Sequence, residues 1–208
     1  MPSIPVKKMN TEKGPALKVA TLDRLRLAAR ELFVGLGYHE TRPQDIARLA
    51  GVANGTFYLH FADKQQAFLD FAEQAQNELL EVMSDRLQEI SGSRERWRVT
   101  CGAVVDFGAE HPGLLQAAFL DPVFIAPRDD NAWRMYDRLG HLVSVTVRNN
   151  RSTDSIGDQQ DEFDDELISH GLCGLLRHSM IYASRRDLNR EKMIEDLSMF
   201  IDRGLGYR

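Results

Sequence analysis

The chain has 208 residues, of which 43% are hydrophobic and 27% charged, and its formal net charge is −5 at pH 7. This length is enough for a substantial core and for one domain or two. The N-terminal stretch has no apolar h-region and no segment is long enough to cross a membrane, so we expect a cytoplasmic protein without a membrane partner. Cys101 and Cys173 lie in apolar helical stretches, which indicates buried thiols rather than a disulfide framework.

The charge is divided unevenly along the chain. Residues 1–64 hold ten Lys and Arg against six Asp and Glu, a net of +4, and the remainder holds sixteen against twenty-five, a net of −9. A basic segment joined to an acidic one is typical of a nucleic-acid-binding head on an acidic body. Chance division of charge is the alternative, and the charge alone does not decide between them.

Residues 1–18 mix Pro, Lys, Ser and Gly, and we expect them to form a flexible basic arm. The first helix follows, preceded by Thr21 as its cap and ended by Gly37. Its apolar face carries Leu22, Leu25, Ala29, Leu32, Phe33 and Leu36.

The stretch 41–64, TRPQDIARLAGVANGTFYLHFADK, predicts two short helices joined by a tight turn. Pro43 suits the first turn of a helix, where its missing N–H costs nothing. Gly51 ends that helix, because glycine takes the left-handed conformation at a helix C-terminus without a Cβ penalty. A second helix opens at Ala53 or Asn54. Helix, glycine turn and helix in this order are typical of a helix-turn-helix motif.

Helical periodicity continues through most of the remaining chain. We expect a long helix from about Asp63 to Ile90, and further helices over Trp97–Ala109, Gly113–Leu120, Asn131–Asn149, Phe163–Arg185 and Arg190–Gly204. Within the expected helix Asn131–Asn149, the segment VSVTV alternates as a strand does, but the preceding WRMYDRLGHL favours a continuous helix. A prolyl loop, DPVFIAPRDD, and an acidic loop over about 151–162 separate them. No βαβ alternation is evident.

The segment AGVANGTFYLHFADK resembles the most characteristic part of the TetR family of bacterial repressors. The matching positions, at fixed spacing, are Thr41, Ile46, Ala47, Gly51, Val52, Gly55, Thr56, Phe57, Tyr58, His60, Phe61 and Lys64. Arg42 and Pro43 depart from the family pattern, which usually has Ser or Thr and then a small aliphatic residue there. The likeness covers about residues 20 to 70; beyond them it is one of helical layout.

The resemblance implies an all-α fold with three parts. These are the flexible arm 1–18, a three-helix DNA-binding head over 19–66, and a ligand-binding and dimerisation body over 67–208. It further implies a homodimer that represses transcription from a palindromic operator and releases the DNA when a small-molecule effector enters the body. A lone helix-turn-helix also reads too few base pairs for useful specificity, so two-fold pairing is expected on physical grounds.

Phosphate contacts are expected to supply much of the affinity for double-stranded DNA, and base contacts the specificity. Family position and chemistry together assign phosphate contacts to Tyr58, His60, Lys64 and Arg42. Asn54 suits adenine, and the Thr56 methyl suits thymine. Gln44 is a further candidate for base reading, and Gly55 permits a close approach of the recognition helix. Phe57 and Phe61 are expected in the core.

Aromatic and apolar residues of the central helices are candidates for the effector pocket: Trp97, Cys101, Val104, Phe107, Phe119, Phe124, Trp133, Tyr136 and Leu139. The scarcity of Lys and Arg among them favours an apolar or aromatic ligand. Tyr136 and Cys101, and less strongly His141, are candidate polar anchors. Ordinary core packing is the alternative for each.

The last two helices carry apolar stripes that predict a four-helix dimer interface with a second subunit. The interface candidates are Ile168, Gly171, Leu172, Leu175, Leu176, Ser179, Leu197, Phe200 and Ile201. Packing of both stripes within one subunit is the alternative.

The sequence lacks the motifs of the commonest enzyme classes: a glycine-rich loop after a strand, a P-loop, HExxH, paired CxxC or GxSxG. His170, Cys173 and His178 do not converge on one helix face, so no metal site is expected. We therefore expect no enzyme, cofactor or metal. A repressor without an effector, or an architectural DNA-binding protein, is the competing interpretation, although an architectural protein would not need so large a helical body.

Overall fold

The computed structural model describes residues 13–120, 130–154, 164–186 and 188–205. All regular elements within these ranges are helices, which confirms the predicted all-α class. The VSVTV segment belongs to a helix. The chain divides into two compact units, residues 1–68 and 69–208, which we call the head and the body.

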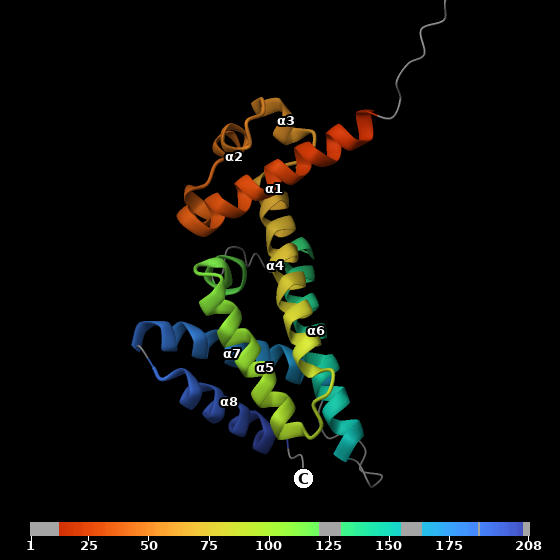
Figure 1. Ribbon diagram of the computed structural model, residues 1–208, viewed down its shortest axis with the longest axis vertical. Coiled ribbons are helices and arrows are strands. Elements are labelled where there is room, and N and C mark those ends of the chain that lie inside the picture. Colours follow the sequence, from red (N-terminus) through yellow and green to blue (C-terminus); the bar gives the residue numbers. More distant parts are fainter. Residues whose placement is uncertain (1–12, 121–129, 155–163, 187, 206–208) are drawn as a thin grey trace, which may run out of the picture. The chain divides into compact units, whose positions relative to one another are not determined.

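The head contains α1 (Lys13–Glu40), α2 (Pro43–Leu49), α3 (Asn54–Tyr58) and the start of α4 (Lys64–Leu87) (Figure 1). Helix α1 begins at Lys13, so residues 13–18 are helical where the sequence predicts an arm. It is interrupted at Gly37, whose φ of 78° is not helical. Just beyond this break the buried Thr41 places its hydroxyl 2.8 Å from the Gly37 carbonyl oxygen. The break lies where the first helix was expected to end.

Local sequence sets the limits of the short helices. Pro43 occupies the first turn of α2. Gly51, with φ of 66°, lies in the left-handed region that follows α2. At the start of α4, the Asp63 carboxylate accepts a hydrogen bond from the Gln66 backbone N–H at 2.8 Å, and the Gln66 side chain in turn accepts one from the Ala62 N–H. This exchange pairs N–H groups that a helix start leaves unsatisfied.

Aromatic side chains form much of the head's core. Phe57 and Phe61 are both buried, as expected, and their ring centroids lie 5.4 Å apart. Phe33 of α1 meets Phe68 of α4 edge to face at 5.2 Å. These contacts hold α3 and the beginning of α4 in place within the head.

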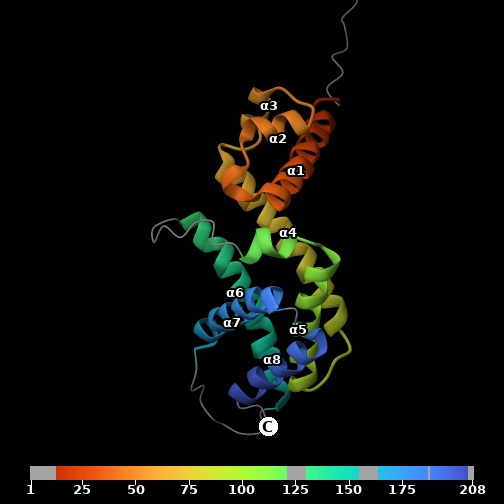
Figure 2. The same ribbon diagram turned by 90° about the vertical axis from the view of Figure 1, so that its left-hand side faces the viewer.

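The body contains the rest of α4, then α5 (Ser93–Glu110), the short π-helix η1 (Gln116–Leu120), α6 (Asp130–Asp154), α7 (Asp165–Arg186) and α8 (Arg190–Gly204). Helix α6 packs against α7, and α5 against α8 (Figure 2). The core between them consists of buried Trp97, Cys101, Val143, Val147, Leu172, Leu176, Ile194 and Ile201.

One carboxylate ties three helices of the body together. Asp106 on α5 accepts hydrogen bonds from Arg86 on α4 at 2.6 Å and from Arg190 Nε at the start of α8 at 2.7 Å. Burial acts to raise the pKa of Asp106, but the two guanidinium groups outweigh it and hold that pKa below its usual value of 3.8. Asp106 therefore stays ionised, and it fixes the end of α4 to α5 and α8.

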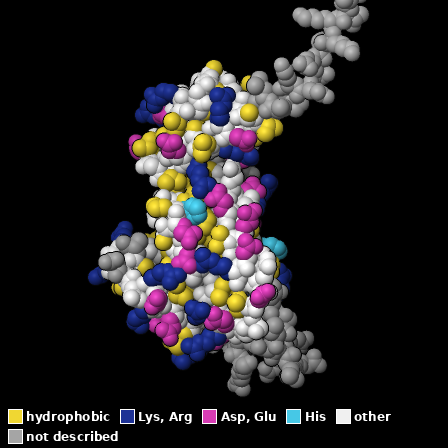
Figure 3. All heavy atoms as spheres, in the orientation of Figure 1, with side chains coloured by type: hydrophobic (Ala, Val, Ile, Leu, Met, Phe, Trp, Pro, Cys, Tyr) yellow, Lys and Arg dark blue, Asp and Glu magenta, His cyan; other side chains and the backbone are white. Residues whose placement is uncertain are grey.

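Charged side chains of both signs are interspersed over the face of the body drawn in Figure 3. The excess acidic charge of the body is thus not gathered into one patch on that face. None of the described helices has the length and apolar character needed to span a membrane.

Candidate DNA-binding surface and ligand cavity

Helix α3 presents Asn54 and Tyr58 outward because Phe57 is anchored inward. Phe57 is fully buried, whereas Asn54, Gly55 and Tyr58 are exposed. Thr56 and His60 are half-buried. The base-reading candidate Asn54 and the phosphate-binding candidate Tyr58 therefore both face solvent, as a contact with DNA requires.

Two further candidates lie at the start of α2. Arg42 has extended backbone angles and caps the helix, and it is exposed, as is Gln44. Asp45 of the same turn is already occupied by Arg48, 2.6 Å away. Arg42 and Gln44 therefore add a cationic and an amide group to the exposed polar surface of the head.

Lys64 differs from the other candidates, because its ammonium group is engaged within the head. Its Nζ donates to the backbone carbonyls of Tyr38, at 2.8 Å, and His39, at 3.2 Å. It also lies 4.2 Å from the centroid of the Tyr38 ring. Lys64 thus fastens the start of α4 to the end of α1, where carbonyl oxygens favour a cation. A phosphate contact by the same side chain stays a prediction.

The body contains a partly open cavity of about 290 Å³. Helices α4, α5, α6 and α7 and the segment around η1 contribute to its lining, which consists of Leu79, Met83, Thr100, Val104, Leu115, Phe119, Trp133, Tyr136, Leu139, Val143, His170, Cys173, Gly174, Leu176, Arg177 and Met180. Most of these side chains are apolar, and the size is near the lower end of small-molecule sites. The cavity is suited to an apolar molecule or to the apolar part of a larger one.

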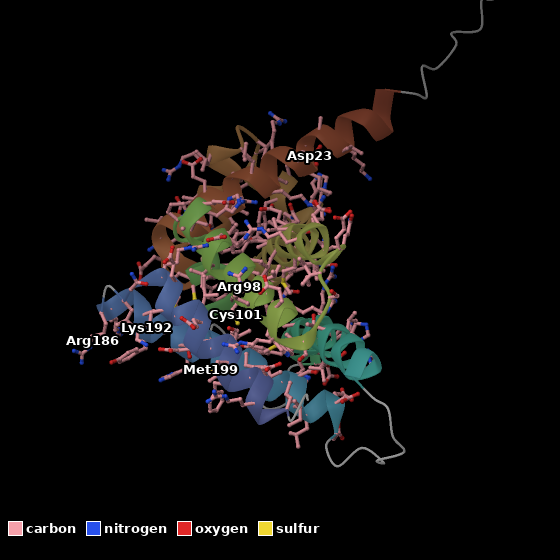
Figure 4. All side chains as sticks on the ribbon, turned by 60° about the horizontal axis from the view of Figure 1, so that its bottom comes forward. Asp23, Arg98, Cys101, Arg186, Lys192 and Met199 are labelled. Carbon is pink, nitrogen blue, oxygen red and sulfur yellow. The ribbon has the colours of Figure 1, made fainter. Side chains whose placement is uncertain are left out.

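The pocket candidates from the sequence fall into three groups. Five line the cavity: Val104, Phe119, Trp133, Tyr136 and Leu139. Trp97, Cys101 and Phe107 are fully buried and absent from the lining, and Figure 4 shows Cys101 among the helices of the body. Phe124 lies outside the described residues.

The polar anchors expected from the sequence do not all lie at the same cavity. Tyr136 reaches the cavity, but His141 lines a different hollow, near the start of α7. Burial raises the pKa of Cys101 to about 12 and that of Cys173 to about 11, so both remain thiols. Of these two cysteines, Cys173 is the one that lines the cavity.

Sequence reasoning missed the contributions of α4 and α7 to the lining. Leu79 and Met83 of α4 were not among the pocket candidates, and apolar residues of α7 were predicted to form a dimer interface. His170 of α7 also lines the cavity and was not among the pocket candidates. It fits against α6 at Gly140, where an added Cβ would lie 2.6 Å from His170 Nε2. A small residue facing a large one across two helices leaves no signal in either helix alone.

Comparison with known proteins identifies the head. Residues 25–70 match the family described as bacterial regulatory proteins, tetR family. The chain belongs to this family. The matched residues include α2, α3 and the aromatic core that supports them, which is where the sequence resemblance was found.

A fatty acid metabolism regulator protein of Bacillus subtilis is 32% identical to this TetR-family chain over 69 residues, 33% of this chain and 36% of the relative. The chain thus spans little more than a third of the length of the curated relatives it first matches. Two solved structures share the fold over much more of the chain. They are Bacillus subtilis FadR in complex with stearoyl-CoA, with 17% identity and a TM-score of 0.70, and Thermus thermophilus FadR in complex with lauroyl-CoA, with 23% identity and a TM-score of 0.67. The first covers 86% of this chain and 97% of its own, and the second 89% and 95%.

The interface candidates of this TetR-family chain divide between two faces of α7 and α8. Leu172, Leu176 and Ile201 are buried in the body's own core. Gly171 and Phe200 are exposed, Phe200 by 65%, and the remaining candidates, Ile168, Leu175, Ser179 and Leu197, are half-buried. On the outer side, a groove between the two helices is lined by residues that include Ser179, Tyr182 and Leu197. Figure 4 shows Arg186 and Lys192 at the outer edge of these helices.

Proposed function

We propose that this TetR-family regulator represses transcription by binding a palindromic operator as a homodimer, and that a long-chain fatty acyl-CoA releases it from the DNA. Its place of action would be the cytoplasm, where the operator and the acyl-CoA are both accessible. The observation that carries the ligand class is the apolar cavity of the body.

DNA binding is supported by the exposed groups of the head. Asn54 is exposed on α3 and has the amide geometry that pairs with adenine. Tyr58 and Arg42 are exposed and suit phosphate oxygens. A second copy of the head is needed for a useful number of base pairs, and the exposed Phe200 on the outer side of α8 supports pairing through α7 and α8.

The acyl-CoA class is supported by two considerations. Two FadR proteins with the same fold are in complex with stearoyl-CoA and lauroyl-CoA. The cavity of this chain has the lining that a hydrocarbon chain requires, since each methylene removed from water contributes ~0.8 kcal/mol. The charged nucleotide part of an acyl-CoA would stay outside, because an unpaired charge is strongly disfavoured in an apolar cavity.

The test begins with selection of an operator from random DNA and measurement of binding by fluorescence anisotropy. Lauroyl-, palmitoyl- and stearoyl-CoA are then titrated, with CoA alone as the control. Release should follow acyl-CoA and not CoA. The acyl-CoA affinity should rise about fourfold for each added methylene until the cavity is filled, as ~0.8 kcal/mol per methylene implies.

A matched pair of variants places the effect in the cavity. Val104→Phe adds an aromatic ring to the lining, whereas Ala109→Phe adds the same ring at an exposed position of α5. The first variant should bind the operator normally and resist release, and the second should behave as wild type. Operator binding that no acyl-CoA alters in wild type would contradict the proposed effector and favour a repressor without one.

A further inference from the structure

Thr100 is a buried polar residue in the mostly apolar lining of the cavity. The residue is 1% exposed and lies on α5, one turn beyond the fully buried Trp97. It lines the cavity, and its Oγ1 has no hydrogen-bond partner within the described part of the chain. Buried polar groups are nearly always paired, so an unpaired hydroxyl beside an empty space marks a place where a ligand atom would be stabilised.

The burial of Thr100 itself places it on the inner side of the cavity. Val143 and Leu176 line the cavity and also belong to the body's core cluster, as does Cys101, the residue after Thr100. Trp133, in contrast, lines the cavity and is 43% exposed. The cavity therefore extends from the core beside Thr100 toward solvent beside Trp133.

A trapped water is a poor partner for this hydroxyl. An ordered buried water needs two to four polar partners. Most of the side chains that line the cavity carry no hydrogen-bonding N–H or O–H, so they offer few partners for such a water. The missing partner is therefore better supplied by the ligand.

We propose that the effector carries a hydrogen-bonding oxygen, a hydroxyl or a carbonyl, in the distal part of its apolar chain, and that Thr100 recognises it. This inference rests on the proposed function, because an acyl-CoA whose nucleotide stays outside directs its distal carbons inward. The Thr100 hydroxyl can donate to a carbonyl and can both donate to and accept from a hydroxyl. The effector is then an oxygenated long-chain acyl thioester rather than a plain saturated one.

The probes are palmitoyl-CoA, palmitoyl-CoAs with one hydroxyl placed successively along the distal half of the chain, and β-hydroxypalmitoyl-CoA as a control with its hydroxyl beside the thioester. Calorimetric affinities are measured for wild type, Thr100→Val and Thr100→Ser. At least one distally hydroxylated probe should bind wild type about tenfold more tightly than it binds Thr100→Val, the size expected of one buried hydrogen bond. Thr100→Ser should retain that preference, and β-hydroxypalmitoyl-CoA should show none.

Equal discrimination by wild type and Thr100→Val would overturn the inference while leaving acyl-CoA binding intact. Failure of every acyl-CoA to bind wild type would instead contradict the proposed function. In that case dodecanol and dodecane, competing with a fluorescent apolar dye, test Thr100 directly. Loss of dodecanol preference in Thr100→Val supports the inference, and an unchanged preference overturns it.

Thermal unfolding of the ligand-free protein gives an independent measurement. Valine keeps the shape and β-branching of threonine and removes an unpaired hydroxyl. The unfolding midpoint of Thr100→Val should therefore equal or exceed that of wild type. A lower midpoint would mean that the hydroxyl is already paired within the protein, and the inference would be wrong.

Discussion

Replacement of Lys64 by methionine should destabilise the protein as well as weaken DNA binding. Methionine keeps an unbranched stem but removes the ammonium group, which donates to the Tyr38 and His39 carbonyls and lies over the Tyr38 ring. Hydrogen bonds from a charged donor contribute about 1.5–3 kcal/mol, and an exposed cation–π contact about 0.5–1 kcal/mol. Because Lys64 is half-exposed and one ammonium group makes all three contacts, we expect a net loss of ~2 kcal/mol.

Thermal unfolding followed by circular dichroism measures this loss. For a chain of 150–250 residues, ~2 kcal/mol lowers the midpoint by about 4–8 °C. Tyr58→Phe is the matched control in the head. The Tyr58 side chain is exposed, so its hydroxyl can be removed with little effect on the midpoint while operator binding weakens about equally on all sequences.

The salt dependence of DNA binding separates the two roles of Lys64. If the ammonium group also contacts a phosphate, Lys64→Met should reduce the slope of log affinity against log salt by ~1. If it serves only to hold α4 to α1, the slope should stay unchanged while the midpoint falls. An unfolding midpoint equal to that of wild type would refute the structural role derived from the contacts of Lys64.

Four other variants test other parts of the molecule. Asn54→Ala should relax the preference at one base pair of the operator, by ~1–3 kcal/mol, without changing the salt slope, as measured on single-site operator variants. Asp106→Asn should lower stability near neutral pH. The pKa of Asp106 is lower in the folded protein than in the unfolded chain, so its carboxylate stabilises the wild type at any pH above the unfolded-state pKa. This stabilisation is lost as the pH falls through the folded-state pKa, and the unfolding free energies of wild type and variant should therefore converge in acid. Phe200→Glu should give monomers in sedimentation with an unchanged helical content by circular dichroism, because the side chain is exposed within one subunit. A surviving dimer would contradict the proposed interface. Leu175→Arg should act in the same direction but lower stability too, since Leu175 packs against the core.

The sequence specified the head more completely than the body. Local sequence was enough to predict the roles of Pro43 at a helix start, Gly51 in the turn and Phe57 in the core. The structure places each of them as predicted. Burial in the body depends instead on which side of a helix meets which neighbour. Thr100 and Cys101 are adjacent on α5, yet the first lines the cavity and the second packs in the core. Periodicity alone cannot tell which of two adjacent residues lines a cavity and which packs in the core, because both are nearly fully buried.

The same limit applies to Leu172 and Leu176 of α7, which were predicted at the dimer interface and are buried in the body's own core. Leu172 and Leu176 fit an apolar stripe at helical spacing, but a stripe of that kind does not reveal whether the partner belongs to the same chain. In the structure both residues pack in the core with Val143 and Val147 of α6. The exposed Phe200 was included in the same set of candidates, and its exposure became evident only from the packing of α8 on α5.

Helix α4 belongs to both units, which makes it the candidate path from cavity to DNA. It is continuous from Lys64, which is fastened to α1 in the head, to Leu79 and Met83, which line the cavity in the body. Within the body, Arg138 of α6 also pairs with Glu73 of α4 at 2.5 Å. We infer that a ligand that displaces Leu79 and Met83 would act on a helix whose first residues belong to the head.

The coupling can be measured as the factor by which ligand weakens operator binding. A factor of ~10² corresponds to ~2.7 kcal/mol of difference in ligand affinity between the free and the DNA-bound forms. Leu79→Ala shortens the side chain through which the ligand would act on α4, so it should reduce this factor more than it reduces the operator affinity of the ligand-free protein. Leu80→Ala, a half-buried neighbour on α4 outside the lining, is the matched control and should leave the factor unchanged. Fluorescence anisotropy on operator DNA with and without palmitoyl-CoA gives both quantities for each variant. If Leu79→Ala keeps the wild-type factor while ligand still binds, the signal does not pass through this side of α4, and the helix serves only to connect the two units.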